Sequence, residues 1–430
     1  MRFHTTTSEW IVIILLAVMS IAYTKLVGLD SRVFHPSAGV SARRTSHARI
    51  STNDPPIPPV APLVWDQTEG AYMVVLTVGD NPVELVLDTG SSQLSVKGDG
   101  CRWRSCDGGD CRVQACPCGV GPDGRAREDC SNHQYNPTGV RVAPGEHGTG
   151  TSTVMTYGSQ VDTIEHYIDT VALRVAPPGV TCEQLVRGGR LRWDDAASST
   201  LTAPRPVVVH RVLHIDGTSS SNLLGLSRPG GGGVEHGYTV VLDAILEKTQ
   251  VWSLVFHGNS GWLVMGALPC VPGVNYVPLV QPAVFKNFLT SFYIVEIESV
   301  FAEVNGRMRA VRDPPRWCIV DTGTTSTYAS TSFGKSLGVA GYVDGTSGLE
   351  LRLRGKTNPV VLTYSAAQLL DPEYPGTTVV QAWPGRTLDD YDQIFPPSYG
   401  GVLLLGALMM KDLYLEFDLA GGRLGVANLG

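Results

Sequence analysis

The sequence of 430 residues is 43% hydrophobic and 17% charged, and it contains 48 glycines and 28 prolines. The charged fraction lies below the roughly 25% of an average soluble protein, and with the apolar fraction it excludes a disordered or coiled-coil chain. The 33 basic and 40 acidic residues give a net charge of −7, and no basic patch indicates a nucleic acid as partner.

An uncharged apolar segment covers residues 10–24 near the N-terminus. It has the length of the apolar region of a secretory signal, and residues 20–22 offer a small-residue cleavage site. Extended to residue 29, it also reaches about the 20 residues that a membrane span needs. Two alternatives stay open for residues 1–29: a cleaved signal peptide, or a signal anchor that holds the protein in the membrane through residues 10–29. Both predict entry into the secretory pathway, with the rest of the chain lumenal or extracellular.

Residues 30–64 have the composition of a pro-segment or linker, because the proline-rich run 55–59 cannot join a β-ladder. After Trp65 the pattern changes to short apolar and β-branched runs separated by turn signals, which is typical of strands. The runs predicted as strands include 72–76, 83–87, 252–256, 261–265 and 293–297. The best helical candidate is 239–248, so the chain is predicted to be mostly β.

A weak internal repeat is the most informative feature of the sequence. The run Val-Leu-Asp-Thr-Gly-Ser-Ser at 86–92 recurs as Ile-Val-Asp-Thr-Gly-Thr-Thr at 319–325. Each copy is followed, after a long interval, by two leucines and a glycine, at 223–225 and at 404–406. A duplicated half implies two similar lobes related by a pseudo-twofold axis, each bringing one Asp to the cleft between them.

With these motifs the chain over 65–430 resembles the pepsin-like aspartic endopeptidases. The Thr-Tyr-Gly-Ser run at 156–159 is similar to the flap hairpin of that family, and the Asp-Thr-Val run at 169–171 follows at the family's spacing. The resemblance implies a mostly β, bilobal pepsin-like fold with its active site between the lobes. The N-terminal lobe, at 65–265, would hold the first catalytic Asp, a Cys-rich insertion and the flap. The C-terminal lobe, at 266–430, would hold the second catalytic Asp.

The resemblance assigns the catalytic pair to Asp88 and Asp321. Two like charges about 3 Å apart cannot both ionise cheaply, so one carboxyl keeps a proton while the other activates a water that attacks the peptide bond. This chemistry needs no cofactor and no metal. We expect protein or peptide substrates and a monomeric enzyme.

The residues that follow the two aspartates support the pair, by the same resemblance. They are Thr89, Gly90, Ser91, Thr322, Gly323 and Thr324. The hydroxyl group three residues after each Asp would donate to its carboxylate, and the threonine directly after each Asp would bond to the opposite lobe. Tyr157, Gly158 and Ser159 would belong to the flap that closes over the substrate. Ser95 replaces a tryptophan common in the family, and Gln160 replaces a flap glycine, so the flap departs from the family pattern.

Six of the nine cysteines fall between residues 101 and 130. In an oxidising lumen we expect disulfides at Cys101, Cys106, Cys111, Cys116, Cys118 and Cys130. By resemblance, Cys101 and Cys106 match a small disulfide loop of the family, and the other four belong to an insertion similar to those of nepenthesin-like and secretory plasmepsin-like enzymes. Zinc is the alternative, but no paired C-x-x-C motif occurs and only one histidine lies near. Cys318 is expected to be a buried core residue and not a nucleophile.

The sequence therefore predicts an aspartic endopeptidase of the secretory pathway. The alternative is a catalytically inactive pepsin-like protein with a binding or inhibitory role. Inactive relatives usually lose an Asp or the hydroxyl group near it, whereas Asp88, Ser91, Asp321 and Thr324 are all present. These four residues favour the enzyme.

Overall fold

The computed structural model describes residues 57–429 apart from a set of internal segments. Those segments are 68, 108–109, 117–133, 142–152, 158–159, 177–179, 188–198, 217–221, 229–240, 247–249, 281–290, 305, 330–332, 334–345, 371–377 and 383–399. The predicted signal or anchor at 1–29 lies outside the described residues, as do Cys118 and Cys130. No helix in the described part of the chain is both long and apolar enough to cross a membrane.

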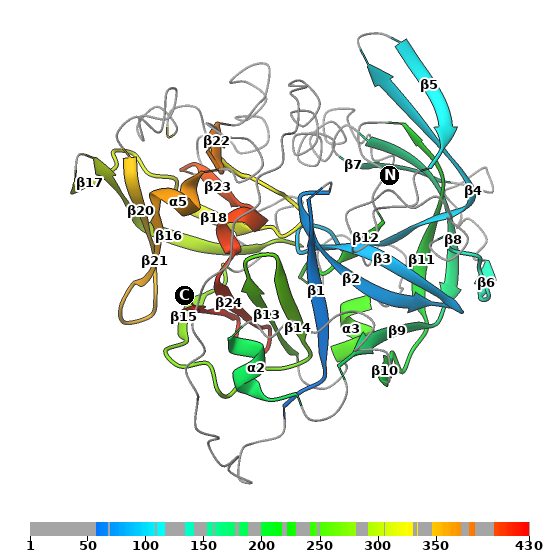
Figure 1. The fold of residues 1–430 in the computed structure, drawn as a ribbon, viewed down its shortest axis with the longest axis horizontal. Helices are drawn as coiled ribbons and strands as arrows, with labels where there is room; N and C mark the ends of the chain where they lie inside the picture. Colours follow the sequence, from blue (N-terminus) through cyan, green and yellow to red (C-terminus); the bar gives the residue numbers. More distant parts are fainter. Residues whose placement is uncertain are drawn as a thin grey trace, which may run out of the picture.

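Strands make up most of the described chain, as predicted (Figure 1). Those of the first half are β1 (Val60–Asp66), β2 (Ala71–Val78), β3 (Asn81–Asp88), β4 (Leu94–Asp107), β5 (Asp110–Ala115), β6 (Val140–Arg141), β7 (Thr153–Tyr157), β8 (Gln160–Asp169), β9 (Val171–Val175), β10 (Ser199–Thr202), β11 (Val207–Asp216), β12 (Leu223–Gly225), β13 (Val251–His257) and β14 (Ser260–Val264). Those of the second half are β15 (Asn275–Pro278), β16 (Tyr293–Val304), β17 (Arg307–Ala310), β18 (Trp317–Val320), β19 (Thr327–Ala329), β20 (Thr346–Leu353), β21 (Val360–Ser365), β22 (Val380–Ala382), β23 (Val402–Leu405), β24 (Leu413–Asp418) and β25 (Arg423–Asn428). The described helices are short: α2 (Cys182–Val186), α3 (Val241–Leu246), α5 (Ala366–Leu369) and the 3-10 helix η4 (Ala407–Met410).

The hydrophobic pattern explains why these segments are strands. Along β21, Val360, Leu362 and Tyr364 are buried while the residues between them are exposed, because successive side chains of a strand point to opposite faces. The paired strands β18 and β23 are buried throughout, as expected for parallel strands covered on both faces. The five predicted strand runs correspond to β2, β3, β13, β14 and β16, and α3 lies within the predicted helix at 239–248.

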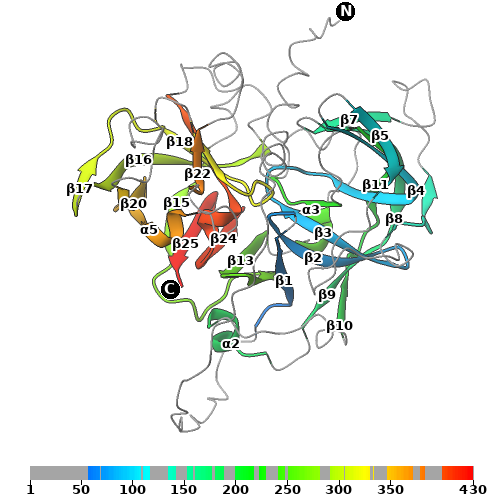
Figure 2. The same cartoon turned by 45° about the horizontal axis from the view of Figure 1, so that its top comes forward.

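The described strands form two sheets, one of 17 strands and one of eight. The smaller sheet has the order β21-β20-β16-β18-β23-β19-β22, with β17 paired to β16. The last hairpin, β24–β25, does not join it: β24 pairs with β13 and β25 pairs with β15 in the larger sheet (Figure 2). The two predicted lobes are therefore joined through a shared sheet that includes the end of the chain.

The first strand begins earlier than the sequence predicted. Val60 to Val64 pair antiparallel with β14, and Ala61 and Leu63 are buried in the core. These residues belong to the sheet, and not to the linker predicted at 30–64. A proline is compatible with the strand at position 62. There β1 pairs with β14 on one side only, because its pairing with β2 begins at Val64. The N–H that Pro62 lacks is therefore not required for a hydrogen bond to β2.

The internal repeat of the sequence is also a repeat of structure. β12 pairs parallel with β3 and antiparallel with β4, and β23 pairs in the same way with β18 and β19. A Cβ atom at Gly225 would overlap the backbone of Gln93, and one at Gly406 would overlap the backbone of Ser326. The glycine of each Leu-Leu-Gly run is thus required because the loop after each Asp crosses directly over it.

Candidate active site

Asp88 and Asp321 occupy equivalent positions in the two halves of the fold. Asp88 is the last residue of β3, and Asp321 directly follows β18. Both are buried to the same extent. The backbone at Asp88 is opposite Gly225, and the N–H of Asp321 donates to the carbonyl of Leu405 at 3.1 Å. Each repeat therefore uses its parallel leucine strand to fix the backbone that carries its Asp.

Four buried hydrogen bonds join the two Asp-Thr-Gly loops. The N–H of Thr89 donates to the Thr322 hydroxyl at 3.1 Å, and the N–H of Thr322 donates to the Thr89 hydroxyl at 3.0 Å. The Thr89 hydroxyl donates to the carbonyl of Val320 at 2.8 Å, and that of Thr322 donates to the carbonyl of Leu87 at 2.7 Å. The loops are therefore held in one relative position.

The motif glycines place each carboxyl group against the opposite loop. A Cβ atom at Gly90 would overlap the carboxyl of Asp321, and one at Gly323 would overlap that of Asp88. The N–H of Gly90 donates to Asp88 Oδ1 at 2.7 Å, and the N–H of Gly323 donates to Asp321 Oδ1 at 3.0 Å. Glycine at both positions leaves the room in which the two carboxyl groups meet.

Burial raises the pKa of both aspartates, and that of Asp321 lies well above its usual range. The pKa of Asp321 is raised further by the negative charge of Asp88 and by a hydrogen bond to it. For Asp88, the nearby Ser91 hydroxyl, the N–H of Gly90 and the carboxyl of Asp321 lower the pKa against the effect of burial. The pair therefore favours a state in which the two carboxyl groups share one proton.

The hydroxyl groups beside the two aspartates are not equivalent. Thr324 Oγ1 donates to Asp321 Oδ2 at 2.7 Å and lowers the pKa of that carboxyl. The Ser91 hydroxyl lowers the pKa of Asp88, but its position does not meet the geometry of a hydrogen bond to any described residue. The two halves therefore support their aspartates to different degrees.

A hairpin lies where the sequence predicted the flap. β7 pairs with β8, and Tyr157 at the end of β7 is opposite Gln160 at the start of β8. Gly158 and Ser159 lie outside the described residues. At the other end of β8, Asp169 is buried and accepts hydrogen bonds from the Tyr135 hydroxyl at 2.8 Å and from three backbone N–H groups at 2.8, 2.9 and 3.1 Å. Burial alone would raise the pKa of Asp169, but these hydrogen bonds outweigh it and lower the pKa.

The first disulfide corrects the predicted pairing. Cys101 bonds to Cys116, with 5.4 Å between their Cα atoms, and not to Cys106. Cys101 and Cys106 lie on the same strand, β4, and five residues of extended chain span about 16 Å. A disulfide cannot bridge that distance. Cys106 is instead opposite Cys111 in the β4–β5 hairpin, and Cys111 is also disulfide-bonded.

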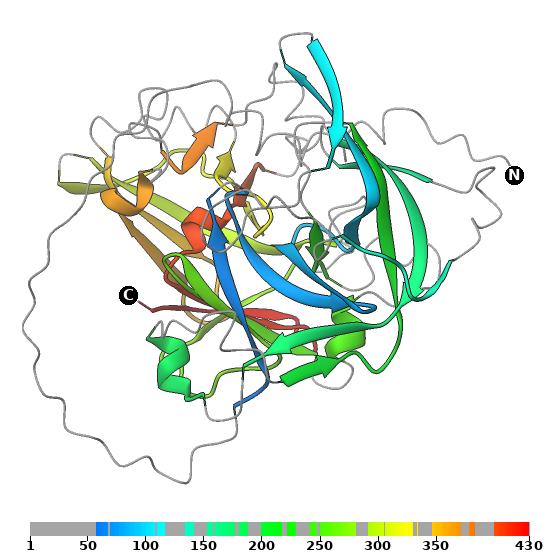
Figure 3. The same ribbon diagram turned by 45° about the vertical axis from the view of Figure 1, so that its right-hand side comes forward.

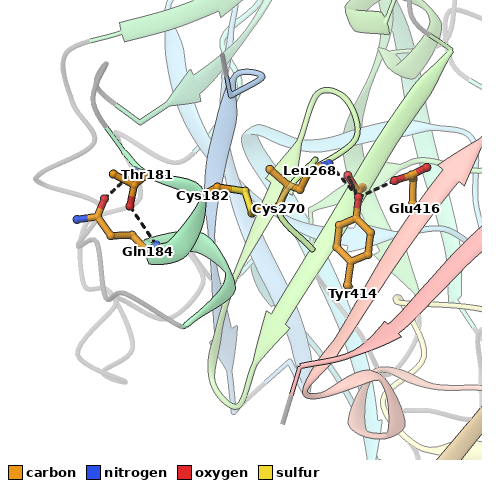
Figure 4. The surroundings of a disulfide bond; sticks show 8 residues. Thr181, Cys182, Gln184, Leu268, Cys270, Tyr414 and Glu416 are labelled. Atoms are coloured by element: carbon orange, nitrogen blue, oxygen red, sulfur yellow. Dashed lines mark hydrogen bonds between the residues drawn. A yellow bond between two sulfur atoms is a disulfide. The ribbon is translucent and has the colours of Figure 1, made fainter. Parts of the chain in front are cut away.

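A second disulfide joins Cys182, at the start of α2, to Cys270, with 6.0 Å between their Cα atoms (Figure 4). Cys318 is a free, buried thiol, and burial raises its pKa to about 12, as expected for a core residue. Disulfides persist in oxidising compartments, so the two bonds indicate an extracellular or secretory environment. Among the described residues, no three His, Cys, Asp or Glu side chains gather into a metal site.

Two polar residues that hold the first motif were missed in the sequence. The Asn222 side chain accepts from the N–H of Lys97 at 2.8 Å and donates to the carbonyl of Glu84 at 3.1 Å, which ties β3 to β4. The Tyr293 hydroxyl donates to the carbonyl of Leu226 at 2.9 Å, just beyond the first Leu-Leu-Gly run. The position of Asn222 directly before that run was the one available signal, and nothing in the sequence marked Tyr293.

No protein-family model matches the chain, and no curated protein matches its sequence. Among solved structures, the fold is similar to that of basic 7S globulin from soybean, with a TM-score of 0.52 and 13% sequence identity. The similarity covers 87% of this chain and 96% of the globulin. At this identity it shows the fold alone, and it confirms the mostly β, bilobal pepsin-like fold.

Proposed function

We propose that the chain is an aspartic endopeptidase, in which Asp88 and Asp321 together activate a water for the hydrolysis of peptide bonds. The observation that carries this proposal is the meeting of two buried carboxyl groups, one from each half of the fold, each against the motif glycine of the other half. Their raised pKa values favour a pair that shares one proton. This is the state that aspartic catalysis requires.

In the proposed mechanism the two carboxyl groups have different roles. Ionised Asp88 takes a proton from the water as it attacks the scissile carbonyl, while protonated Asp321 donates a hydrogen bond to the carbonyl oxygen. The proton on Asp88 then passes to the leaving nitrogen as the peptide bond breaks. The Thr89–Thr322 bonds keep the two groups in register, which matters because small displacements of reacting groups are costly to rate.

The proposed substrates are proteins or peptides in the secretory pathway or outside the cell, and the proposed enzyme is a monomer. The Cys101–Cys116 and Cys182–Cys270 disulfides support the compartment. Residues 10–29 leave both a secreted and a membrane-anchored form within the proposal.

The direct test replaces each carboxyl group by an amide. Asp88→Asn and Asp321→Asn should each abolish peptide hydrolysis at acid pH, because the water loses its base or the carbonyl loses its acid. The matched control is Asp80→Asn, since Asp80 is exposed in the turn between β2 and β3. Circular dichroism should show the same fold in all three variants. If either active-site variant kept a tenth of wild-type turnover, the assignment would be wrong.

The alternative function, an inactive pepsin-like binding or inhibitory protein, is compatible with the similarity to a globulin. A statine-type peptide separates the two, because its hydroxyl takes the place of the attacking water between the carboxyl groups. An active pair should bind this peptide far more tightly than the corresponding ground-state peptide, and Asp321→Asn should lose the difference. The gain in melting temperature on binding gives a readout that needs no known substrate. Equal binding by wild type and Asp321→Asn would favour the inactive protein.

A further inference from the structure

The flap hairpin is one end of a wider sheet. β8 pairs with β7 on one side and with β11 on the other, β11 pairs with β4, and β4 pairs with β5. Figure 2 places these five strands together, and Figures 1 and 3 show the β4–β5 hairpin extending beyond the body of the protein. The Cys101–Cys116 disulfide closes the base of this hairpin. We refer to the β4–β5 hairpin as the arm.

The two faces of this sheet differ in burial. The register places Trp103, Ile215 and Asp162 side by side on neighbouring strands, and all three are buried. In the two neighbouring rows of cross-strand residues, one on each side of this row, the side chains point to the opposite face of the sheet. One row contains Val113, Arg104, Asp216 and Val161, and the other contains Ala115, Arg102, His214, Thr163 and Val154. We call this outer face, which runs from the arm to the flap, the flap–arm face.

Three exposed valines lie on the flap–arm face. Val113 is 59% exposed, Val154 is 63% exposed and Val161 is 38% exposed. These are three of the six large hydrophobic residues that are exposed in the described part of the chain. Val113 lies on the arm, and Val154 and Val161 lie on the flap hairpin, so exposed apolar side chains flank the centre of the face on both sides.

The centre of the same face carries two arginines against one carboxylate, that of Asp216. Arg102 and Arg104 lie between the exposed valines of the arm and those of the flap, in a chain whose net charge is −7. Arg104 pairs with Asp216 at 3.2 Å, whereas Arg102 makes no ion pair with a described residue. The flap–arm face therefore complements a ligand that combines acidic and apolar side chains.

The arm also offers an open strand edge. Among the described residues β5 pairs only with β4, and its side chains from Cys111 to Ala115 are all exposed. Over Arg112 to Ala115, such an edge offers backbone N–H and carbonyl groups to which a further strand can bond. The occupant that fits is thus an extended segment of polypeptide.

We propose that the flap–arm face docks an extended, acidic segment of a protein substrate, away from the bond that is cut. The segment would add to the edge of β5, with carboxylates directed to Arg102 and Arg104 and an apolar side chain beside Val113. This inference rests on the proposed function. β4 begins at Leu94, six residues after Asp88, and rises at most about 33 Å before it reaches Arg104. One substrate chain can therefore occupy both the Asp88–Asp321 pair and the arm.

Two other occupants fit less well. The chain's own segment 30–56 contains Arg32, Arg43, Arg44 and Arg49 against two aspartates, so it has the same sign of charge as the face. A second copy of the chain would pair two basic edges if two arms met symmetrically. Binding of segment 30–56 and binding of a second copy are both outcomes that the experiments below can reveal.

The first experiment measures binding without catalysis. The full chain carrying Asp88→Asn is titrated with a fluorescein-labelled octapeptide of alternating glutamate and valine, and anisotropy reports the Kd. Arg102→Glu with Arg104→Glu should weaken binding about tenfold or more, and salt should weaken binding to the parent chain. The matched control is Arg307→Glu with Arg309→Glu on β17, which is also an exposed strand paired to one neighbour, and it should leave the Kd unchanged. The proposal is overturned if the two pairs of substitutions weaken binding equally. It is also overturned if the parent chain binds a lysine–valine octapeptide with the same affinity.

Two further readouts identify the occupant. Arg102→Glu with Arg104→Glu should raise KM for a protein substrate that has an acidic segment and leave kcat/KM for a hexapeptide unchanged, because six residues span at most about 22 Å. An equal loss of kcat/KM for the protein substrate and for the hexapeptide contradicts docking. A dimer in sedimentation that these substitutions dissociate would assign the face to a second copy, and tighter peptide binding after removal of residues 1–56 would assign it to that segment. The binding assay uses the Asp88→Asn variant and requires no catalysis. Its result can therefore be interpreted even if the proposed function is wrong.

Discussion

The hydroxyl groups of Thr89 and Thr322 hold each other's loops. Each accepts the backbone N–H of the other threonine, at 3.0 and 3.1 Å, and each donates to the carbonyl that directly precedes the opposite aspartate. Those carbonyls belong to Val320 and Leu87. The two aspartates cannot move apart without breaking four buried hydrogen bonds. The geometry of the pair is therefore a property of the interface between the two halves.

Removing one of these hydroxyl groups should destabilise the protein. Thr322→Val keeps the shape of the side chain but leaves the N–H of Thr89 and the carbonyl of Leu87 without their partner. Each buried polar group without a partner costs about 1–3 kcal/mol, so the loss of two partners should lower the free energy of unfolding by about 2–6 kcal/mol. Denaturant titration measures the change. The control is Thr363→Val, at an exposed position on β21. It should change the free energy of unfolding by at most about 0.5 kcal/mol. A similar effect of the two substitutions would contradict the role of Thr322.

The hydroxyl groups beside the aspartates should act on different limbs of the pH profile. Thr324 lowers the pKa of Asp321, so Thr324→Val should raise that pKa further and move the alkaline limb of kcat/KM to higher pH. Ser91 lowers the pKa of Asp88, so Ser91→Ala should raise the pH at which the pair takes up its second proton. The acid limb should then move to higher pH. If both substitutions moved the same limb, the assignment of the shared proton to Asp321 would be wrong.

The repeat of the sequence indicated the two aspartates and the residues beside them, because each motif is local and occurs twice, and the family resemblance that it supports predicted the fold class. The disulfide of Cys101 was predicted wrongly because pairing depends on the register of β4 against β5, which is not encoded in the spacing of cysteines along one strand. The start of β1 was placed too late for a related reason. A run of prolines hid a strand whose partner, β14, lies some 200 residues away. The union of flap and arm in one sheet likewise depends on pairings between distant strands.

The buried acid of the pair should make stability depend on pH. The pKa of Asp321 is higher in the folded state than the roughly 3.9 of an unfolded chain, so its proton stabilises the fold at low pH. That contribution is complete below about pH 3.9 and is lost as the pH rises through the folded-state pKa. Asp321→Asn cannot ionise, and at neutral pH it should therefore be more stable than wild type. The gain should be about 1.4 kcal/mol for each unit by which folding raises the pKa. In denaturant titrations between about pH 4 and pH 8, the free energies of unfolding of the two proteins should diverge as pH rises. The control Asp80→Asn should show the same pH dependence as wild type.

The two disulfides should differ in what they contribute to stability. Cys182–Cys270 closes a loop with a sequence separation of 88, whereas Cys101–Cys116 closes one of 15. In the chain-entropy account a cross-link stabilises by restricting the unfolded chain, more so for a longer loop. Replacing Cys182 and Cys270 by serine should lower the free energy of unfolding by about 4–5 kcal/mol, and replacing Cys101 and Cys116 by about 3 kcal/mol.

Double replacements are used so that neither cysteine of a disulfide is left as an unpaired thiol that could form a new bond. Guanidinium titrations of the two double variants and of wild type give the comparison. The contacts around Cys270 should survive its loss, because the Tyr414 hydroxyl accepts from the N–H of Leu268 at 3.0 Å and donates to Glu416 at 2.7 Å without involving sulfur (Figure 4). A larger loss from the Cys101–Cys116 pair would contradict the entropic account. It would mean that the native contacts at the base of the arm, where Trp103 packs beside that disulfide, contribute more than loop closure does.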